Sequence, residues 1–412
     1  MVIEIRNVIE SSAKIVMKNS EWRYDIFCVY SLPIFRKDLK NKIMEHTVMT
    51  ESQTRYDNLT LYLTLNCNLN CSYCFCGKKY IQEMSMDTAQ KAIALFDKKS
   101  MEKSNIAFFG GEPLLKLDLI KKIIELNQNE YKNKFTFSIT TNGTLLTENV
   151  YSYLRQNNVN VLLSMDGSRE SHDLNRKHYD GSGSWDTIFH NIQSFIGELS
   201  VRMTFSKTTV GKLFENLVAL YELGFASVAF YPASGDEWNE HDFYVFDREI
   251  SKFVEYIYNH YCGGRAIHSH WIDKSISRHI SGVMDSCNPG VTQFSVLPNG
   301  ELFPCNHTNF SSKDLQIGSL EKGLDEKKVF WLLEQSKITD EECQDCCLKD
   351  RCNYCYINMY EETGELWKIP DWYCRMNQTV IMYADQLASR LYSKRNPAFM
   401  KKFYYIEEPS EE

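Results

Sequence analysis

Closely spaced cysteines are the clearest chemical feature of this 412-residue chain. Cys67, Cys71 and Cys74 follow an apolar, strand-like run over 59–65 and have the spacing C-x3-C-x2-C. Three thiolates from one short loop can bind three irons of a 4Fe–4S cube, because cysteine thiolate is the usual ligand of such clusters. The fourth iron is then open to a cofactor. A zinc site or a structural group of reduced thiols is the alternative that these cysteines alone leave open.

Two further features favour the cluster. Tyr73 places an aromatic ring directly before the last cysteine, and a second strand-like run, 106–109, leads into the sequence GGEP at 110–113. C-x3-C-x-aromatic-C after one strand and GGEP after the next resemble the radical S-adenosylmethionine (SAM) superfamily. The resemblance implies that the three cysteines hold the catalytic cluster, whose open iron binds the amino and carboxylate groups of SAM.

The same resemblance makes Tyr73, Gly110, Gly111 and Glu112 candidate cofactor-binding residues. Glycine has no Cβ, so Gly110 and Gly111 would let the backbone approach the ligand more closely than other residues could. Glu112 would accept hydrogen bonds from the ammonium group of SAM.

A later segment extends the resemblance. Residues 164–176 read SMDGSRESHDLNR and resemble the S-x-D-G…H-D…R signature of the peptide-modifying branch of the superfamily. By resemblance, Ser164 and Arg176 bind the SAM carboxylate. A guanidinium suits this task because its fork can meet both carboxylate oxygens.

Three more residues have two interpretations each. Asn142 and Asp166 would reach the ribose of SAM or order the loop, although Asn-Gly and Asp-Gly are also ordinary turn dipeptides. Tyr231, in the last strand-like run of this part of the chain, would lie near the adenine or belong to the core.

The elements that must position these residues alternate between strand and helix. Strand-like runs lie at 59–65, 105–109, 134–140, 159–165, 201–206 and 226–231. Helical patterns lie between them at 87–99, 117–128, 147–157, 185–197 and 212–222. This alternation predicts an α/β fold with a parallel sheet, and six such units match the partial (β/α)6 TIM-type barrel of radical SAM enzymes. Chemistry in such barrels lies at the carboxyl ends of the strands.

A second set of cysteines lies in the last third of the chain. The spacing C-x12-G-x4-C over 287–305 precedes C-x2-C-x5-C-x2-C over 343–355, and Cys374 follows. This arrangement resembles the cysteine-rich SPASM iron–sulfur domain, whose seven cysteines hold two auxiliary 4Fe–4S clusters, which would make three clusters in all. Asn299-Gly300 is expected to form a two-residue turn in the SPASM hairpin. A zinc ribbon is the alternative.

The family pattern divides these cysteines between the two clusters. One cluster would have four ligands, Cys343, Cys346, Cys352 and Cys374. The other would have three, Cys287, Cys305 and Cys355, with one iron open unless the additional Cys347 closes it. The spacing departs from the family, because only two residues separate Cys352 from Cys355. Cys28, Cys76 and Cys262 are interpreted as bystanders, although Cys76 is close to the first cluster.

Composition bounds the other possibilities. The formal net charge of −8 argues against a sequence-independent grip on nucleic acid. No apolar run reaches the length of a membrane span, and the polar start is no signal peptide. We therefore expect a cytoplasmic protein with neither nucleic acid nor membrane as a partner. Fourteen cysteines without an export signal favour metal ligation over disulfides.

The expected domains follow from these patterns. They are an N-terminal extension at 1–57, the radical SAM barrel at 58–232, a connector at 233–285, a SPASM domain at 286–376, and a C-terminal helix with an acidic tail at 377–412. Residues 1–57 either cap the core domain or form a reduced leader-peptide-binding element, which would add a peptide strand to its sheet.

By resemblance, we expect a maturase that crosslinks a ribosomally made precursor peptide through a thioether or carbon–carbon bond. A 5′-deoxyadenosyl radical would abstract hydrogen, with electrons from a flavodoxin or ferredoxin-type donor. The alternative enzyme is an anaerobic sulfatase-maturating, formylglycine-generating enzyme. That group has a carboxylate after the Pro-Cys of the hairpin, where this chain has Asn306, although Asp371 could substitute. The non-enzymatic alternative is an iron–sulfur electron-transfer protein, which needs no SAM site.

Overall fold

The computed structural model describes residues 56–76, 81–282, 288–308, 312–335, 341–344 and 346–404. The chain divides into two compact units, Met1–Thr47 and Val48–Glu412, and every described residue belongs to the second. Residues 1–55 of the expected N-terminal extension and the candidate ligand Cys287 lie outside the described residues.

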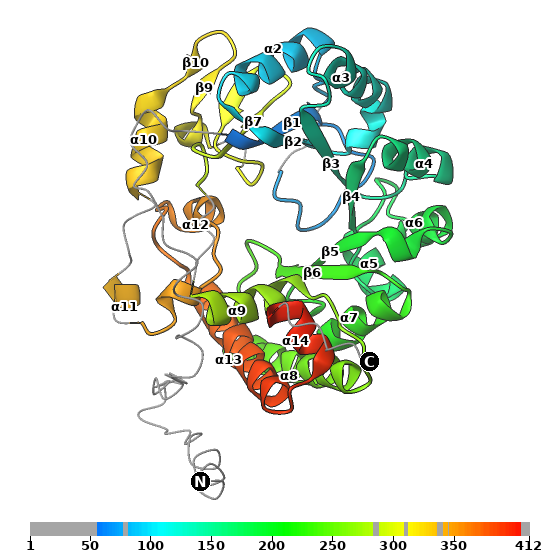
Figure 1. Ribbon diagram of the computed structural model, residues 1–412, viewed down its shortest axis with the longest axis vertical. Coiled ribbons are helices and arrows are strands. Elements are labelled where there is room, and N and C mark those ends of the chain that lie inside the picture. Colours follow the sequence, from blue (N-terminus) through cyan, green and yellow to red (C-terminus); the bar gives the residue numbers. More distant parts are fainter. Residues whose placement is uncertain are drawn as a thin grey trace, which may run out of the picture. The chain divides into compact units, whose positions relative to one another are not determined.

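Six parallel strands form the first part of the sheet, in chain order (Figure 1). They are β1 (Tyr56–Thr64), β2 (Ser100–Gly110), β3 (Phe135–Thr141), β4 (Val159–Ser164), β5 (Ser200–Phe205) and β6 (Ser227–Pro232). Each pairs in parallel with the next. The expected strands and their parallel order are confirmed.

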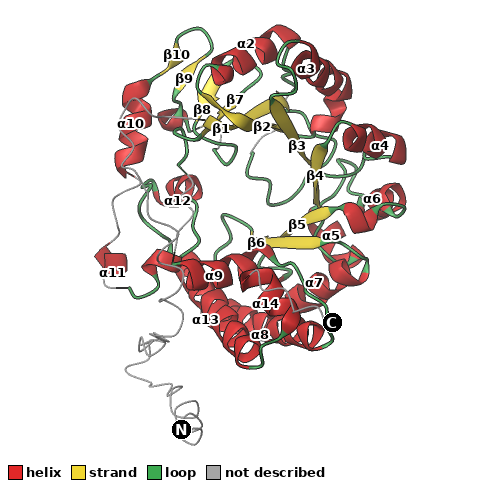
Figure 2. Cartoon of the chain, in the orientation of Figure 1, coloured by secondary structure: helices red, strands yellow, loops and turns green. Residues whose placement is uncertain are grey.

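The helices between the strands lie outside them (Figure 2). They are α2 (Met86–Asp97), α3 (Leu117–Asn129), α4 (Glu148–Gln156), α5 (Arg169–Asn175), α6 (Trp185–Ile192) and α7 (Leu213–Glu222). All but α5 match an expected helix. The short helix α5 begins after Ser168, whose side chain accepts a hydrogen bond from the Ser171 N–H, and seven residues give too little periodicity to be recognised.

The two faces of the strands differ in polarity. In β5, Val201, Met203 and Phe205 are buried, whereas Ser200, Arg202 and Thr204 between them are only partly buried. Because successive side chains of a strand point to opposite faces, the apolar set packs under the helices. The inner face is left polar and can serve a ligand.

A C-terminal hairpin continues the same sheet. β7 (Gln293–Val296) pairs in parallel with β1, and β8 (Glu301–Phe303) pairs antiparallel with β7. The short strands β9 (Gly318–Ser319) and β10 (Gly323–Leu324) complete a ten-stranded sheet. The hairpin therefore lies beside the strand that leads into the cysteine loop.

The turn of this hairpin corrects one expectation. The Leu297 N–H donates to the Glu301 carbonyl at 3.0 Å, so Pro298, Asn299 and Gly300 form a three-residue loop and not a two-residue turn. Gly300 has a φ of 84°, as expected for the glycine that ends such a loop. Proline at the first position starts the turn one residue early.

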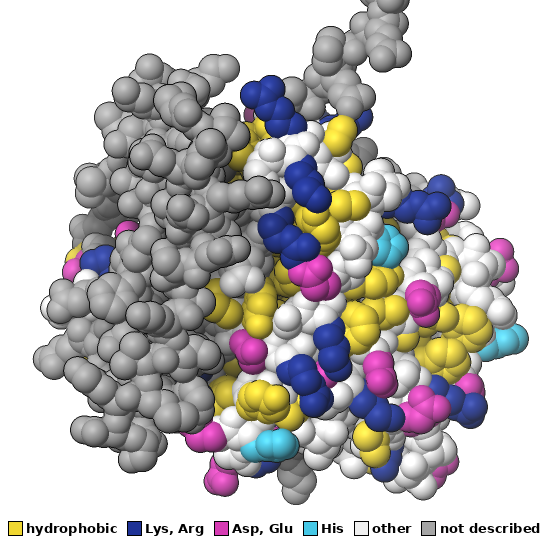
Figure 3. All heavy atoms as spheres, turned by 90° about the horizontal axis from the view of Figure 1, so that it is seen from below, with side chains coloured by type: hydrophobic (Ala, Val, Ile, Leu, Met, Phe, Trp, Pro, Cys, Tyr) yellow, Lys and Arg dark blue, Asp and Glu magenta, His cyan; other side chains and the backbone are white. Residues whose placement is uncertain are grey.

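The remaining helices are C-terminal to the barrel strands. They are α8 (Glu240–Cys262), α9 (His270–Ser281), α10 (Glu326–Gln335), α11 (Glu341–Gln344), α12 (Tyr356–Thr363), α13 (Asp371–Ser393) and α14 (Pro397–Tyr404). α13 packs against α8 and α9 (Figure 1), and it runs through the position expected to end the SPASM domain. None of the described helices is long and apolar enough to cross a membrane. On the face in Figure 3, basic and acidic side chains are interspersed.

Candidate active site

The three cysteines of the C-x3-C-x2-C sequence lie in the loop that follows β1. Cys67 is buried, whereas Cys71 and Cys74 are partly exposed. The Leu69 N–H lies 3.4 Å from the Cys67 Sγ, and the Asn142 Nδ2 lies 3.7 Å from the same sulfur. N–H donors of this kind stabilise thiolates and tune iron–sulfur clusters, so the loop fits the group expected there.

Gly110 and Gly111 bring the end of β2 against this loop. A Cβ on Gly110 would lie 2.2 Å from the Thr64 carbonyl oxygen, and one on Gly111 would lie 2.0 Å from that of Asn66. The close approach lets the Gly111 N–H donate to Thr64 at 2.9 Å. The backbone that the glycines approach is therefore that of the cysteine loop, and closeness to the ligand itself stays a prediction.

Glu112 is fully buried and accepts hydrogen bonds from the protein. Its Oε1 accepts from the Leu114 N–H at 3.0 Å and from the Thr141 hydroxyl at 2.7 Å, and its Oε2 accepts from the Asn142 N–H at 2.7 Å. Burial raises the pKa of Glu112 to about 7, although these hydrogen bonds oppose the shift. The carboxylate thus ties the ends of β2 and β3 together, and its contact with the SAM ammonium remains a prediction.

Asn142 is hydrogen-bonded to the cysteine loop. Its Nδ2 donates to the Asn68 Oδ1 at 2.9 Å, and its Oδ1 accepts from the Thr144 N–H at 3.0 Å. Asn68 in turn donates to the Thr144 hydroxyl at 2.7 Å. A closed set of hydrogen bonds therefore joins the end of β3 to the loop.

Asp166 and Arg176 form a buried ion pair beside the cysteine loop. The Arg176 Nε lies 2.9 Å from the Asp166 Oδ2, and the side chains are 9% and 2% exposed. The Tyr73 hydroxyl donates to the same Oδ2, and the Thr204 N–H donates to Oδ1 at 2.9 Å. Among the described residues, nothing accepts a hydrogen bond from the two terminal nitrogens of Arg176. Two donors of its fork are left for a ligand.

His172 belongs to the signature at 164–176, and it connects the two members of the ion pair. Its Nδ1 accepts from the Asp166 N–H at 3.2 Å, and its Nε2 lies 3.0 Å from the Ser184 hydroxyl, which donates to the Arg176 carbonyl. Burial lowers the pKa of His172 to about 3, so the ring is neutral with its proton on Nε2. The ring holds both members of the ion pair in place.

Arg202 was missed from the sequence. It lies in β5 next to Ser164 of β4, and its guanidinium stands 5.1 Å from the centre of the Tyr231 ring. Burial lowers the pKa of Arg202, and within the described part of the chain no carboxylate lies within ion-pair distance of it. The sequence did contain a signal for Arg202, because a cation inside the otherwise apolar run SVRMTF is expected to face a ligand or the inside of the barrel. Ser164, Arg202 and Tyr231 thus share the inner face of the barrel.

Four cysteines of the second set lie near one another. Burial, together with the thiolates of Cys374, Cys343 and Cys346, raises the pKa of Cys352 to about 12. The Gln378 Nε2 lies 3.4 Å from the Cys374 Sγ. Thiols so crowded resist ionisation unless a metal supplies positive charge, so this set fits a cluster. The four are those that the family pattern assigns to one cluster.

The other cysteines are placed in part. Cys305 is buried, Cys355 is partly exposed with its pKa raised by burial, and Cys347 is exposed. In the residues that the structure describes, no three His, Cys, Asp or Glu side chains converge on a single metal ion. The thiolates of a 4Fe–4S cube each bind a separate iron.

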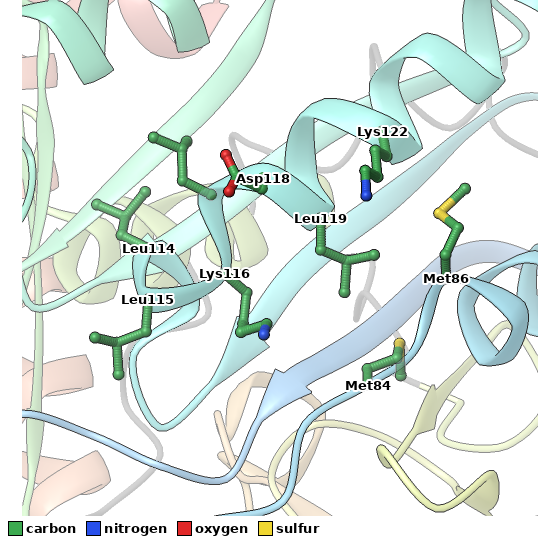
Figure 4. A pocket seen from close by; sticks show the side chains of 9 residues that line it. Met84, Met86, Leu114, Leu115, Lys116, Asp118, Leu119 and Lys122 are labelled. Atoms are coloured by element: carbon green, nitrogen blue, oxygen red, sulfur yellow. The ribbon is translucent and has the colours of Figure 1, made fainter.

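A pocket of about 330 Å³ lies elsewhere, between the segment before α2 and the start of α3 (Figure 4). Met84, Met86, Leu114 and Leu119 line it together with Lys116 and Lys122. None of the candidate site residues lines this pocket.

Residues 61–216 match the family model described as "Radical SAM superfamily". The chain therefore carries a radical SAM domain, the domain of an enzyme family that uses a 4Fe–4S cluster and SAM. This match and the fold confirm the resemblance and the partial barrel. They give no support to the electron-transfer alternative.

The chain is similar in sequence to enzymes of more than one kind. The chain is 24% identical to a cysteine-type anaerobic sulfatase-maturating enzyme of Clostridium perfringens, over 77% of this chain and 93% of that protein. It is 31% identical to the radical SAM cyclopropyl synthase TigE of Paramaledivibacter caminithermalis, over 33% of this chain and 31% of that protein.

Two solved structures have a similar fold. anSMEcpe with bound AdoMet and Cp18Cys peptide superimposes with a TM-score of 0.71 at 23% identity, covering 82% of this chain and 99% of that one. Streptococcus suis SuiB bound to precursor peptide SuiA gives a TM-score of 0.55 at 16% identity, covering 78% and 76%.

Proposed function

We propose that this chain is a radical SAM maturase that crosslinks a ribosomally synthesised peptide through a thioether or carbon–carbon bond. The observation that carries the proposal is one arrangement of side chains. The cysteine loop and the Asp166–Arg176 pair lie at the carboxyl ends of the barrel strands, and a second group of thiols follows in the same unit.

Each predicted site residue then has a role. Cys67, Cys71 and Cys74 would bind three irons, and the bound cluster with SAM would supply a 5′-deoxyadenosyl radical that takes hydrogen from the peptide. Asp166 fixes the Arg176 Nε, so the two terminal nitrogens of Arg176 would be left to bind the SAM carboxylate.

The auxiliary cysteines would bind two further clusters, which accept the electron that the substrate loses. One cluster would be fully ligated by Cys343, Cys346, Cys352 and Cys374. This is supported by the electrostatic effect of the other three thiolates on Cys352 and by the contact of Gln378 with Cys374. Cys305 and Cys355, with Cys287, would hold the other. A flavodoxin or ferredoxin-type protein would reduce the catalytic cluster.

A peptide substrate is supported by the similar structures, in which anSMEcpe binds a Cp18Cys peptide and SuiB binds the precursor peptide SuiA. Arg202, which lies beside Ser164 and Tyr231 on the inner face of the barrel, is a cation that a peptide carboxylate could bind.

The sulfatase-maturating reaction is the second candidate, and the relative from Clostridium perfringens favours it. The side chain after the hairpin cysteine argues against it. Asn306 stands where that group has a carboxylate, and an amide cannot act as a base at neutral pH. The alternative acid, Asp371, is exposed at the start of α13.

The two candidates make different products from different peptides. The reconstituted chain should be given SAM and a reductant with either a precursor peptide encoded beside its gene or a sulfatase peptide containing the target cysteine. Mass spectrometry should find a crosslink in the first and no formylglycine in the second. Formylglycine without any crosslink would reverse the assignment.

A further inference from the structure

We propose that Arg202 binds a carboxylate of the peptide substrate inside the barrel. The chain would then select a peptide that carries an aspartate, a glutamate or a free C-terminus in the segment that enters the barrel. The inference rests on the proposed function in requiring that a peptide enters there, and it does not depend on which bond is then formed.

The position of Arg202 in β5 directs its side chain to the inner face of the barrel. Val201 and Met203, on either side of it, are buried under the helices, so Arg202 lies on the opposite face of the strand. Thr204, the next residue on that face, donates its N–H to the Asp166 Oδ1 at 2.9 Å. Arg202 therefore shares a strand and a face with a residue that contacts the predicted SAM site.

An aromatic ring holds the guanidinium of Arg202. The central carbon of the guanidinium lies 5.1 Å from the centre of the Tyr231 ring in β6. That ring stacks on the fully buried Trp271 of α9, with centroids 6.0 Å apart and an interplanar angle of 22°. A cation is attracted to the face of an aromatic ring, so this contact positions the guanidinium. It gives the N–H groups no oxygen acceptor.

Arg202 also lacks the oxygen partner that comparable arginines have. It is only partly exposed, and within the described part of the chain its guanidinium makes no hydrogen bond or ion pair. A cation removed from water costs free energy unless it is paired. The other described arginines that are not exposed each donate to a carboxylate or a backbone carbonyl, namely Arg176, Arg278, Arg351, Arg375 and Arg390.

A carboxylate is the anion that best completes this arrangement. A guanidinium remains charged in proteins and carries its donors in a planar fork, which can meet both oxygens of one carboxylate. Burial lowers the pKa of Arg202, and none of the groups that oppose this shift is a carboxylate. A peptide can supply the missing group from an acidic side chain or from its C-terminus.

SAM also has a carboxylate, but a different arginine is placed beside the cysteine loop. The Arg176 guanidinium lies 5.4 Å from the centre of the Tyr73 ring, and Asp166 holds its Nε. The aromatic partner of Arg202 belongs instead to β6, on the other side of β5 from the loop. The two arginines would therefore bind two carboxylates, Arg176 that of SAM and Arg202 that of the peptide.

The test measures binding without turnover, for the precursor peptide encoded beside the gene and for the sulfatase peptide. Each peptide is prepared in three forms: unchanged, with every aspartate and glutamate changed to asparagine and glutamine, and with an amidated C-terminus. Fluorescence anisotropy gives the dissociation constants with the full reconstituted chain, saturated with SAM and not reduced. The variants are Arg202→Gln, Arg202→Lys and, as the control, Arg265→Gln, which removes the same charge from an exposed position.

We expect the unmodified chain to bind one of the peptides at least about 10-fold more weakly when its side-chain or its C-terminal carboxylates are removed. The form that loses affinity identifies the source of the carboxylate. Arg202→Gln should weaken binding of the unchanged peptide by a similar factor and should no longer distinguish the forms. Arg202→Lys should keep part of the preference, and Arg265→Gln should match the unmodified chain. The SAM dissociation constant without peptide should stay the same in Arg202→Gln, which shows that the barrel is folded.

Three results would overturn the role of Arg202 alone. They are equal binding of all three forms of a bound peptide by the unmodified chain, a preference that survives in Arg202→Gln, and weaker SAM binding to Arg202→Gln, which would place Arg202 in the SAM site. If neither peptide bound the unmodified chain, the peptide substrate and the proposed function would fall together. Binding without a crosslink would overturn the proposed reaction and leave the carboxylate site standing.

Discussion

At the scale of single residues, several of the predicted site residues are hydrogen-bonded to one another or to the cysteine loop. Asp166 fixes Arg176 and Tyr73, and Asn142 fixes the cysteine loop. These partnerships were not predictable, because they join residues from different strand ends whose side-chain directions depend on the folded loops. The residue types were predictable, since the chemistry requires thiolates and an arginine fork.

Arg176→Lys should weaken SAM binding despite keeping the charge. Lysine would place its single nitrogen near Asp166 and would lose the two terminal donors of the fork. Losing one charge-assisted hydrogen bond costs about 1.5–3 kcal/mol, which corresponds to about a 10- to 100-fold rise in the dissociation constant. Calorimetry on the reconstituted chain measures it, and Arg169→Lys, on the exposed side of α5, is the control. Equal dissociation constants for both variants would show that Arg176 does not bind SAM.

Gly111→Ala should destabilise the chain by at least about 2 kcal/mol, since a Cβ would lie 2.0 Å from the Asn66 carbonyl oxygen and the backbone must shift. Gly197→Ala is the matched control, because the nearest atom to its added Cβ is 3.8 Å away. Denaturant unfolding measures the difference. A midpoint for Gly111→Ala equal to that of Gly197→Ala would contradict the close approach of GGEP to the cysteine loop.

Glu112 should make stability depend on pH. Its pKa is about 7 in the folded chain and near 4.5 when exposed, so the folded state binds a proton more tightly than the unfolded state does. The stabilisation that this proton binding adds to the folded state is fully present below about pH 4.5 and is lost as the pH rises through about 7. The loss in unfolding free energy is roughly 3 kcal/mol at most. The difference in unfolding free energy between the unmodified chain and Glu112→Gln isolates this carboxyl. If the difference in unfolding free energy between the two proteins were constant from about pH 4.5 to 7, the pKa of Glu112 would not be raised in the folded chain.

At the scale of elements, the sequence predicts the barrel well and the C-terminal part less well. Six strands and five of the helices between them follow from hydrophobic period, because each strand is buried beneath a helix. The hairpin turn differs by one residue, since Pro298 starts it early. That β7 would pair with β1 was not predictable, because no local pattern encodes a contact between strands so far apart in sequence.

The helix α9 gives a test at this scale. Arg278 is buried, and its Nη1 donates to the Cys352 carbonyl at 2.9 Å and to the Arg351 carbonyl at 3.3 Å. Arg278→Met should release this turn and reduce the iron held by the four-cysteine group, while SAM cleavage persists in the barrel. Iron analysis beside an assay for 5′-deoxyadenosine measures both. Full iron content in Arg278→Met would show that α9 does not support the cluster.

At the scale of the whole molecule, one sheet carries both the cysteine loop and the hairpin that leads to Cys305. The radical SAM match spans residues 61–216, and the hairpin that leads to Cys305 adds to the same sheet at β1. The cysteine loop and the hairpin before Cys305 are therefore built on adjacent strands, so in the proposed enzyme a substrate at the barrel mouth would lie near both. The arrangement suits a reaction that needs a radical at one point and an electron acceptor at another.

The most direct test of this account is reductive cleavage of SAM by the chain and by a variant with Cys67, Cys71 and Cys74 all changed to Ala. The unmodified chain, reconstituted and reduced, should form 5′-deoxyadenosine. The triple variant should form none and yet retain its auxiliary iron, because those ligands come from other segments. Cleavage of SAM by the triple variant, or its absence in the fully loaded unmodified chain, would contradict the assignment of the catalytic cluster.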